Sequence, residues 1–181
     1  MQFFTEESFN KIPQSLISEI NVITPNSPQF NNKDSNLPTL YLSYAILDKK
    51  LVIKTATFLK SVYQNIHIDW AEYSMSEKNC IDNATNIKNK IITNNKFILI
   101  ATSASIFSRW VNWELGIADS NKYSTDNLAI FPIVDPKSNW HGNDYLNIYP
   151  RIEQPTKSSI NSCNLVYPDG TVKSLQDWLE S

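Results

Sequence analysis

Glycine is scarce in this chain, and its few positions argue against several classes of nucleotide-binding protein. The 181 residues include only three glycines, and none lies in the turn directly after residues 40–43, the first run with strand character. A P-loop and a Rossmann fingerprint both need glycines in the turn after a strand, where the backbone approaches a phosphate. The sequence therefore argues against a kinase, a GTPase and a Rossmann dehydrogenase.

Cysteine and histidine are rarer still. Cys80 and Cys163 lie far from each other and from the histidines, so neither a disulfide framework nor a zinc site with paired ligands is expected. His67 alternates within a predicted strand and His141 falls in a late loop, which leaves a serine nucleophile without a well-placed histidine base. A serine hydrolase is thus not favoured, and no metal is expected.

Neither an excess of positive charge nor a long hydrophobic run is present. A formal charge of −2 gives no general field for polyanions, so nucleic acid is not an expected partner. No window approaches the roughly 18 uninterrupted apolar residues of a membrane span, and the first residues lack the basic segment of a secretory signal. We therefore expect a cytoplasmic protein without a membrane partner.

Strands and helices alternate along the centre of the chain. Short apolar runs are separated by segments with apolar residues three and four positions apart, which indicates strand–helix–strand units. The strands are expected at residues 40–43, 66–70, 96–101 and 128–134, and the helices at 49–64, 81–93 and 107–121. Such units close by right-handed crossovers, so we predict an α/β fold with a flavodoxin-like, doubly wound parallel sheet.

The two ends of the chain differ from this centre. Residues 4–20 have mostly helical spacing and residues 24–38 are rich in Asn, Pro and Ser, which predicts an N-terminal helix and linker at 1–37 and a domain at 38–181. The weaker pattern after Pro136 predicts a short helix, two short strands around a Pro-Asp-Gly turn and a terminal helix, at residues 145–149, 164–167, 171–173 and 175–179.

The segments that follow the strands are the candidate sites, because a parallel sheet places its ligand crevice beyond the carboxyl ends of its strands. Asp48 and Asp69 follow the first two strands and also suit a phospho-acceptor receiver domain. That function needs a phosphorylatable aspartate after the third strand, where this chain has Ala101, Thr102 and Ser103. The receiver domain is therefore the weaker interpretation.

Glu114 interrupts an apolar stripe. In a helix over residues 107–121 it shares a face with Phe107, Trp110 and Val111. Burying an ionised carboxylate without a partner costs several kcal/mol, so such a residue is usually paired, protonated or used in chemistry. Two interpretations stay open: a Glu at the edge of the stripe, bonded to an Arg or a backbone amide, or the centre of a site.

Three segments, in this order, resemble the boxes of the TIR (Toll/interleukin-1 receptor) domain family. They are Leu40-Tyr-Leu-Ser-Tyr-Ala-Ile-Leu-Asp48, Ile66-His-Ile-Asp-Trp70 and Ser108-Arg-Trp-Val-Asn-Trp-Glu114, and the similarity covers roughly residues 38–135. In that family the first box is a strand ending in Ser-Tyr or Ser-Phe, the second ends in an aspartate before the so-called BB loop, and the third has Ser-x-Trp before a Glu. Residues 143–150 resemble the tails of stand-alone prokaryotic TIR proteins of anti-phage defence.

The resemblance implies that Glu114 is the catalytic carboxylate of an enzyme that cleaves NAD at the nicotinamide–ribose bond. Aromatic surface for nicotinamide or adenine would come from Tyr44, Trp70 and Trp110. The other residues that it places in the substrate site are Ser43, Asp48, Asp69 and Ser108. Two of these have structural alternatives, because Asp48 also suits a helix N-cap and Asp69 suits an anchor for the loop that follows it.

On this interpretation NAD is a substrate, and no cofactor is needed. The product would be ADP-ribose or a cyclic or conjugated derivative that acts on a separate effector protein, and activity would depend on self-association through TIR–TIR contacts. The alternative is a non-catalytic scaffold that binds other TIR domains through its BB loop, here residues 71–79. That loop lacks the Gly or Pro of many members, and Val111 stands where a cysteine often occurs.

Overall fold

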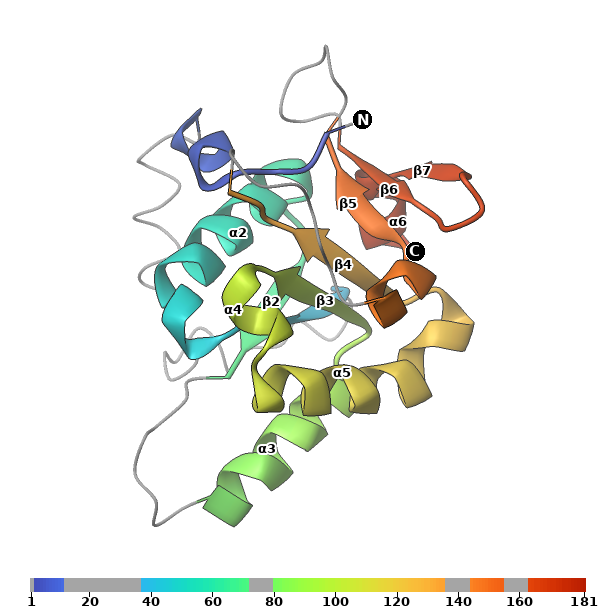
Figure 1. The fold of residues 1–181 in the computed structure, drawn as a ribbon. Helices are drawn as coiled ribbons and strands as arrows, with labels where there is room; N and C mark the ends of the chain where they lie inside the picture. Colours follow the sequence, from blue (N-terminus) through green and yellow to red (C-terminus); the bar gives the residue numbers. More distant parts are fainter. Residues whose placement is uncertain (1, 12–36, 72–79, 136–143, 155–162) are drawn as a thin grey trace.

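The computed structural model describes residues 2–11, 37–71, 80–135, 144–154 and 163–181, which build one seven-stranded sheet (Figure 1). From β2 to β5 neighbouring strands run parallel, and β6 and β7 extend this sheet in antiparallel pairing. In sheet order the strands are β2 (His67–Trp70), β1 (Thr39–Ser43), β3 (Lys96–Ala101), β4 (Leu128–Pro132), β5 (Arg151–Glu153), β6 (Asn164–Val166) and β7 (Val172–Ser174). The expected α/β class, with a mostly parallel sheet, is confirmed.

Burial on both faces explains the composition of the central strands. Every residue of β3 and β4 is buried, and a strand covered on both sides needs a nearly continuous apolar run. In the register Leu42 is opposite Ile98, which is opposite Ala129. Side chains alternate between the faces, so Leu40 and Leu42 enter one hydrophobic cluster and Tyr41 enters the other.

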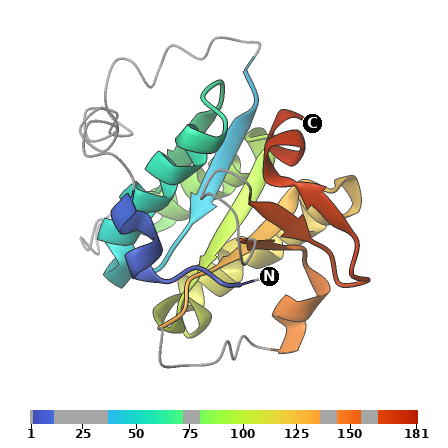
Figure 2. The ribbon, with the colours of Figure 1, turned by 90° about the horizontal axis from the view of Figure 1, so that it is seen from above.

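Helices cover both faces of the sheet (Figures 1 and 2). Helices α2 (Lys49–Val62) and α6 (Leu175–Glu180) contribute to the cluster that contains Leu42. Helices α3 (Cys80–Thr93) and α5 (Arg109–Lys122) contribute to the cluster that contains Tyr41. Shorter helical segments are η1 (Glu6–Lys11), η3 (Ile46–Asp48), α4 (Ser103–Ile106), η5 (Tyr123–Thr125) and η6 (Asp144–Ile148). Within the described residues, none of the helices has the length and apolar character that a membrane span requires.

The helix expected at 107–121 begins later than predicted. Thr102 caps α4, and Ser108 then caps α5, so that Phe107 falls in the link between two helices. Phe107 is 84% exposed and takes no part in the apolar stripe. A serine directly before a periodic segment is a common N-cap, because its hydroxyl accepts from an otherwise unpaired amide, and this local signal decides the boundary.

The first residues are part of the main hydrophobic core. Phe4 and Phe9 are fully buried among α2 and β4 residues, with the Phe4 ring 4.8 Å from that of Phe131. Phe4 forms a bridge with Ile133 instead of lying in the helix expected over 4–20. Among residues 4–11 of that range, η1 is helical and lies beside α2 (Figure 2). Residues 12–36, which hold the rest of that predicted helix and the linker, lie outside the described residues.

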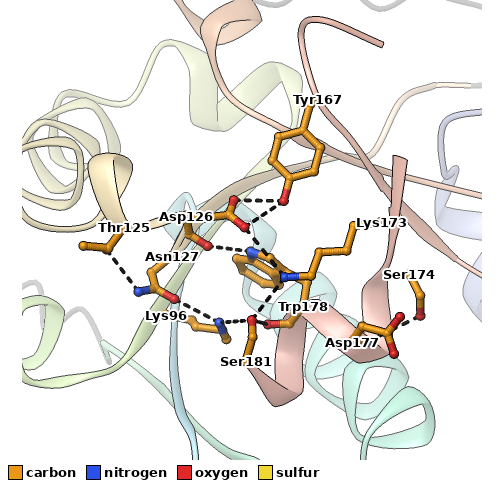
Figure 3. A network of polar contacts seen from close by, with 10 residues as sticks. All are labelled: Lys96, Thr125, Asp126, Asn127, Tyr167, Lys173, Ser174, Asp177, Trp178 and Ser181. Atoms are coloured by element: carbon orange, nitrogen blue, oxygen red, sulfur yellow. Dashed lines mark hydrogen bonds and ion pairs between the residues drawn. The ribbon is translucent and has the colours of Figure 1, made fainter. Parts of the chain in front are cut away.

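The C-terminal hairpin and α6 are bound to the turn that precedes β4 (Figure 3). Asp126 adopts the left-handed conformation in that turn, with φ 57°. Its carboxylate accepts from the Tyr167 hydroxyl at 2.8 and 2.9 Å, and its carbonyl accepts from Trp178 Nε1 at 2.7 Å. The two short strands expected around the Pro-Asp-Gly turn are present, whereas β5 was not predicted.

Candidate functional site

The crevice that the strand order predicts lies where β1 and β3 end. These two strands are neighbours in the sheet, but their chains continue toward opposite sides, into α2 and into α4 and α5. Asp48 follows β1 and Thr102 follows β3, and Thr102 Oγ1 donates to Asp48 Oδ2 at 2.6 Å. Thr102 also caps α4 through a reciprocal pair of hydrogen bonds with Ser105. One hydrogen bond thus joins the two loops at the switch point of the sheet.

Asp48 is half-buried, and its charge is disfavoured. Burial raises the pKa of its carboxyl above the ordinary value of 3.8, the hydrogen bond from Thr102 opposes this rise, and the negative charge of Glu6 adds to it. Asp48 occupies the N-cap position of α2, but its side chain makes no capping hydrogen bond. Its contact with Thr102 is therefore the specific role that the structure gives to this carboxylate.

Glu114 lies on the buried face of α5. The buried residues of this helix are Val111, Glu114, Leu115, Ala118 and Lys122, which recur at spacings of three and four. Glu114 itself is 0% exposed, so it stands inside the stripe and not at its edge. The hydroxyl of Tyr41, on β1, donates to Glu114 Oε1 at 3.5 Å. This contact joins a carboxylate of α5 to strand β1, which lies between β2 and β3.

Ser43 adds a second polar group on the same side of β1. It follows Tyr41 by two positions, and alternation along a strand places both side chains on one face. Ser43 is 0% exposed, and its Oγ makes no hydrogen bond with any residue that the structure describes. A buried hydroxyl without such a bond is uncommon, because hydrogen bonding normally offsets its loss of water. Ser43 and Tyr41 therefore lie on the same face of β1, and Tyr41 reaches Glu114 of α5 from that face.

The three aromatic residues expected around Glu114 are not brought together. Tyr44 and Trp70 pack in the cluster on the α2 side of the sheet, where the Tyr44 hydroxyl donates to the carbonyl of Ala71 at 2.9 Å. Trp110 lies on α5, 37% exposed, with its ring edge-on to Trp113 at 5.4 Å. The expectation of a pocket of three aromatic rings around Glu114 is therefore wrong. Tyr44 directly follows Ser43, so its side chain points to the opposite face of the sheet.

Asp69 and Ser108 hold the framework of this region. Asp69 is buried at the end of β2 and accepts from Lys90 Nζ of α3 at 2.8 Å, so it joins the strand to the helix as an anchor. Ser108 Oγ accepts from the amide of Val111 at 3.4 Å, which caps the first turn of α5. Both side chains are engaged in these structural contacts, beside any role toward a substrate.

Two polar side chains of this region were not anticipated from the sequence as members of a site. Tyr41 belongs to a mostly apolar strand segment, although its spacing from Ser43 predicts that both side chains lie on one face. Thr102 lies in the segment where a receiver domain would have its phosphorylatable aspartate. A threonine between a buried strand and a helix is also a capping signal. Among the described residues no group of three His, Cys, Asp or Glu side chains is arranged to hold a metal ion.

No protein-family model and no curated protein matches this chain. The resemblance to TIR domains therefore depends on the three sequence segments themselves. In the structure these segments supply β1 with its following loop, β2 and the start of α5.

Proposed function

We propose that this protein cleaves NAD at the nicotinamide–ribose bond, with Glu114 as the catalytic residue. The observation that carries this proposal is a fully buried carboxylate on the sheet-facing side of α5, which accepts a hydrogen bond from the phenol of Tyr41 on β1. These groups come from two of the three segments that resemble TIR domains. The product is ADP-ribose or a cyclic or conjugated derivative, which acts on a separate effector protein in anti-phage defence.

The chemistry suits a site with one carboxylate. The bond from ribose C1′ to the nicotinamide nitrogen breaks, and its electron pair leaves with nicotinamide, which becomes neutral without taking up a proton. A positive charge develops on the ribose, and a nearby carboxylate stabilises it, as in glycoside hydrolysis. Water or another nucleophile then forms the new bond to C1′ and releases its proton. The surrounding apolar layer increases the strength of the electrostatic interaction, because less water screens it.

The buried position of Glu114 sets a condition for this reaction. Its carboxylate is covered in the structure, so NAD binding must move some part of the cover to reach it. Trp110 lies one turn before Glu114 on α5 and is partly exposed, which makes it the aromatic surface for a planar base. Asp48 and Ser43 supply the polar contacts for the rest of the substrate. Self-association is a natural cause of such a movement.

The test is nicotinamide release and product mass from NAD, with wild type, Glu114→Gln and Glu153→Gln compared at several protein concentrations. Glu153 is a matched control, since it is also a buried glutamate but lies on β5, paired with Arg151 at 3.3 Å. We expect turnover to fall at least a hundredfold in Glu114→Gln and to persist in Glu153→Gln. Equal turnover in wild type and Glu114→Gln, with all three proteins folded, would reject this role of Glu114.

A non-catalytic scaffold is the second candidate function, and one observation favours it. Large apolar side chains are exposed on η3 and around the start of α5, elements that are both in contact with α4. Exposed apolar patches of this kind mark protein interaction sites. Their members, with exposed fractions, are Ile46 (44%), Leu47 (84%), Phe107 (84%), Trp110 (37%) and Trp113 (38%).

The scaffold is tested by sedimentation of wild type and of a Leu47→Ser, Phe107→Ser double variant. Loss of self-association in the variant, with no NAD turnover in any associated wild-type sample, would favour the scaffold over the enzyme. Turnover that depends on Glu114 would decide for the enzyme.

A further inference from the structure

Tyr41 is a buried tyrosine in the middle of strand β1, which lies between β2 and β3 in the sheet. It is 0% exposed, and its ring stacks on that of Phe97 in β3, with the ring centres 5.9 Å apart and the planes 18° apart. The same cluster contains small and apolar residues such as Ala101 and Leu115. A phenol placed in such surroundings needs a hydrogen-bond partner, because it has lost its contact with water. The stacked ring fixes where that phenol can reach.

The hydroxyl of Tyr41 reaches Glu114. The distance of 3.5 Å to Oε1 is long for a hydrogen bond to a carboxylate, since charge-assisted bonds between oxygens are usually about 2.5–2.7 Å. Hydrogen bonds of active sites are often long without substrate and shorten in the reacting complex. The geometry thus leaves room for this contact to strengthen when charge develops on the substrate.

We propose that Tyr41 is a positioning residue for Glu114, an inference that rests on the proposed NAD cleavage. Its phenol holds the carboxylate on the β1 side of the site and favours the ionised form, which the positive charge on the ribose requires. Tyr41 itself touches no reacting atom. Its effect reaches the reaction only through the orientation and the charge of Glu114.

Two lysines on the elements around Glu114 make contacts with other groups. Lys122 lies two turns further along the same face of α5, where its amine donates to the carbonyl of Asn94. Lys90 of α3 pairs with Asp69. The hydroxyl of Tyr41 donates to Glu114 from β1. Its removal would therefore change the surroundings of Glu114 without breaking either of these lysine contacts.

The variant Tyr41→Phe isolates the hydroxyl, because phenylalanine keeps the ring that stacks on Phe97. Tyr149→Phe is the matched control. Tyr149 is also buried, and its hydroxyl donates to another carboxylate of α5, that of Asp119, at 2.9 Å. Both variants lose one phenol that faces α5, but only Tyr41→Phe loses it at Glu114.

The first readout is infrared titration of the carboxyl stretching band of Glu114, assigned by its absence in Glu114→Gln. Loss of a donor disfavours the charged carboxylate, so the midpoint should rise by about one pH unit in Tyr41→Phe and stay in place in Tyr149→Phe. The second readout is NAD turnover. In Tyr41→Phe we expect kcat to fall about tenfold on the acidic side of the pH profile, with KM nearly unchanged.

The two readouts separate this inference from the proposed function. A shifted band together with a shifted acidic limb supports the positioning role. An unchanged band in Tyr41→Phe overturns it, even if wild type cleaves NAD. If the band shifts in Tyr41→Phe but wild type cleaves no NAD, the contact with Glu114 is supported, whereas the proposed function is rejected, and with it the catalytic part of the role of Tyr41.

Discussion

At the scale of single residues, Lys96 shows how a buried charge is accommodated far from the candidate site. It is the first residue of β3 and is 1% exposed (Figure 3). Its amine donates to Asn127 Oδ1 at 2.9 Å and to Ser181 Oγ at 3.4 Å, and it lies 4.7 Å from the centre of the Trp178 ring. The pKa of Lys96 is lowered to about 8, mainly by burial and also by the positive charge of Lys173, whereas the negative charge of Asp126 opposes the change.

This shift predicts that stability depends on pH. The folded pKa of about 8 lies below the unfolded value of 10.5, so the unfolded chain binds more protons between these limits and stability rises with pH across them. From pH 7.5 to 9 the contribution of Lys96 amounts to about 1 kcal/mol. Urea unfolding of wild type and Lys96→Met at both pH values should show this rise in wild type relative to the variant.

The comparison cancels contributions that the two proteins share. Burial of Cys163 raises its pKa to about 12 from 9.0, so its contribution falls as the pH rises above 9, equally in both proteins. Parallel pH dependence in wild type and Lys96→Met would mean that Lys96 keeps its proton in the folded state and titrates normally.

At the scale of elements, α5 determines where Glu114 lies. Ser108 caps its first turn, and the buried residues that follow set the rotation of the helix against the sheet. This rotation could be predicted in part from spacing, since Val111 and Ala118 share a buried face with Glu114, whereas Trp110, expected on that face, is 37% exposed. The start of the helix depends on the Ser108 cap, which leaves Phe107 outside the helix. Apolar spacing alone places Phe107 in the buried stripe.

Two substitutions at Ser108 distinguish capping from substrate binding. Ser108→Ala should lower the free energy of unfolding by about 1 kcal/mol, because the amide of Val111 loses its acceptor, whereas Ser108→Asp should retain most of the stability. Chemical denaturation measures both. If capping is the role of Ser108, NAD turnover per folded molecule stays near wild type in Ser108→Asp. A loss of turnover in both variants, with stability retained in Ser108→Asp, would place Ser108 in the substrate site.

At the scale of the whole molecule, local patterns predicted strands β1 to β4 and the two strands of the C-terminal hairpin, β6 and β7, whereas β5 was not predicted. Residues 96–101 and 128–134 are apolar enough to be identified as buried strands in isolation. By contrast, Arg151–Glu153 is short and carries two charged residues, and it becomes a strand by pairing with β4 and β6. The contact between Tyr41 and Glu114 is also long-range, since the two residues are 73 positions apart in the sequence. The catalytic role of Glu114 stays a prediction.

The shared core predicts that the ends of the molecule unfold together with its centre. One cluster contains Phe4 and Phe9, central residues such as Leu42 and Phe131, and Trp178 of α6. Phe4→Ala removes a fully buried ring and should lower the free energy of unfolding by about 3–5 kcal/mol. Phe107→Ala is the control, since that ring is 84% exposed and its loss should change stability by about 0.5 kcal/mol or less.

Circular dichroism and tryptophan fluorescence should report the same lowered midpoint in Phe4→Ala, because cooperative unfolding has one transition for all probes. Fluorescence is informative here because Trp70 and Trp178 are both buried in the cluster that Phe4 enters, one at the β2 side of the sheet and one on α6. If Phe4→Ala left this midpoint at its wild-type value, residues 2–11 would contribute little to the stability of the fold. The prediction that the N-terminal residues unfold together with the rest of the core would then be wrong.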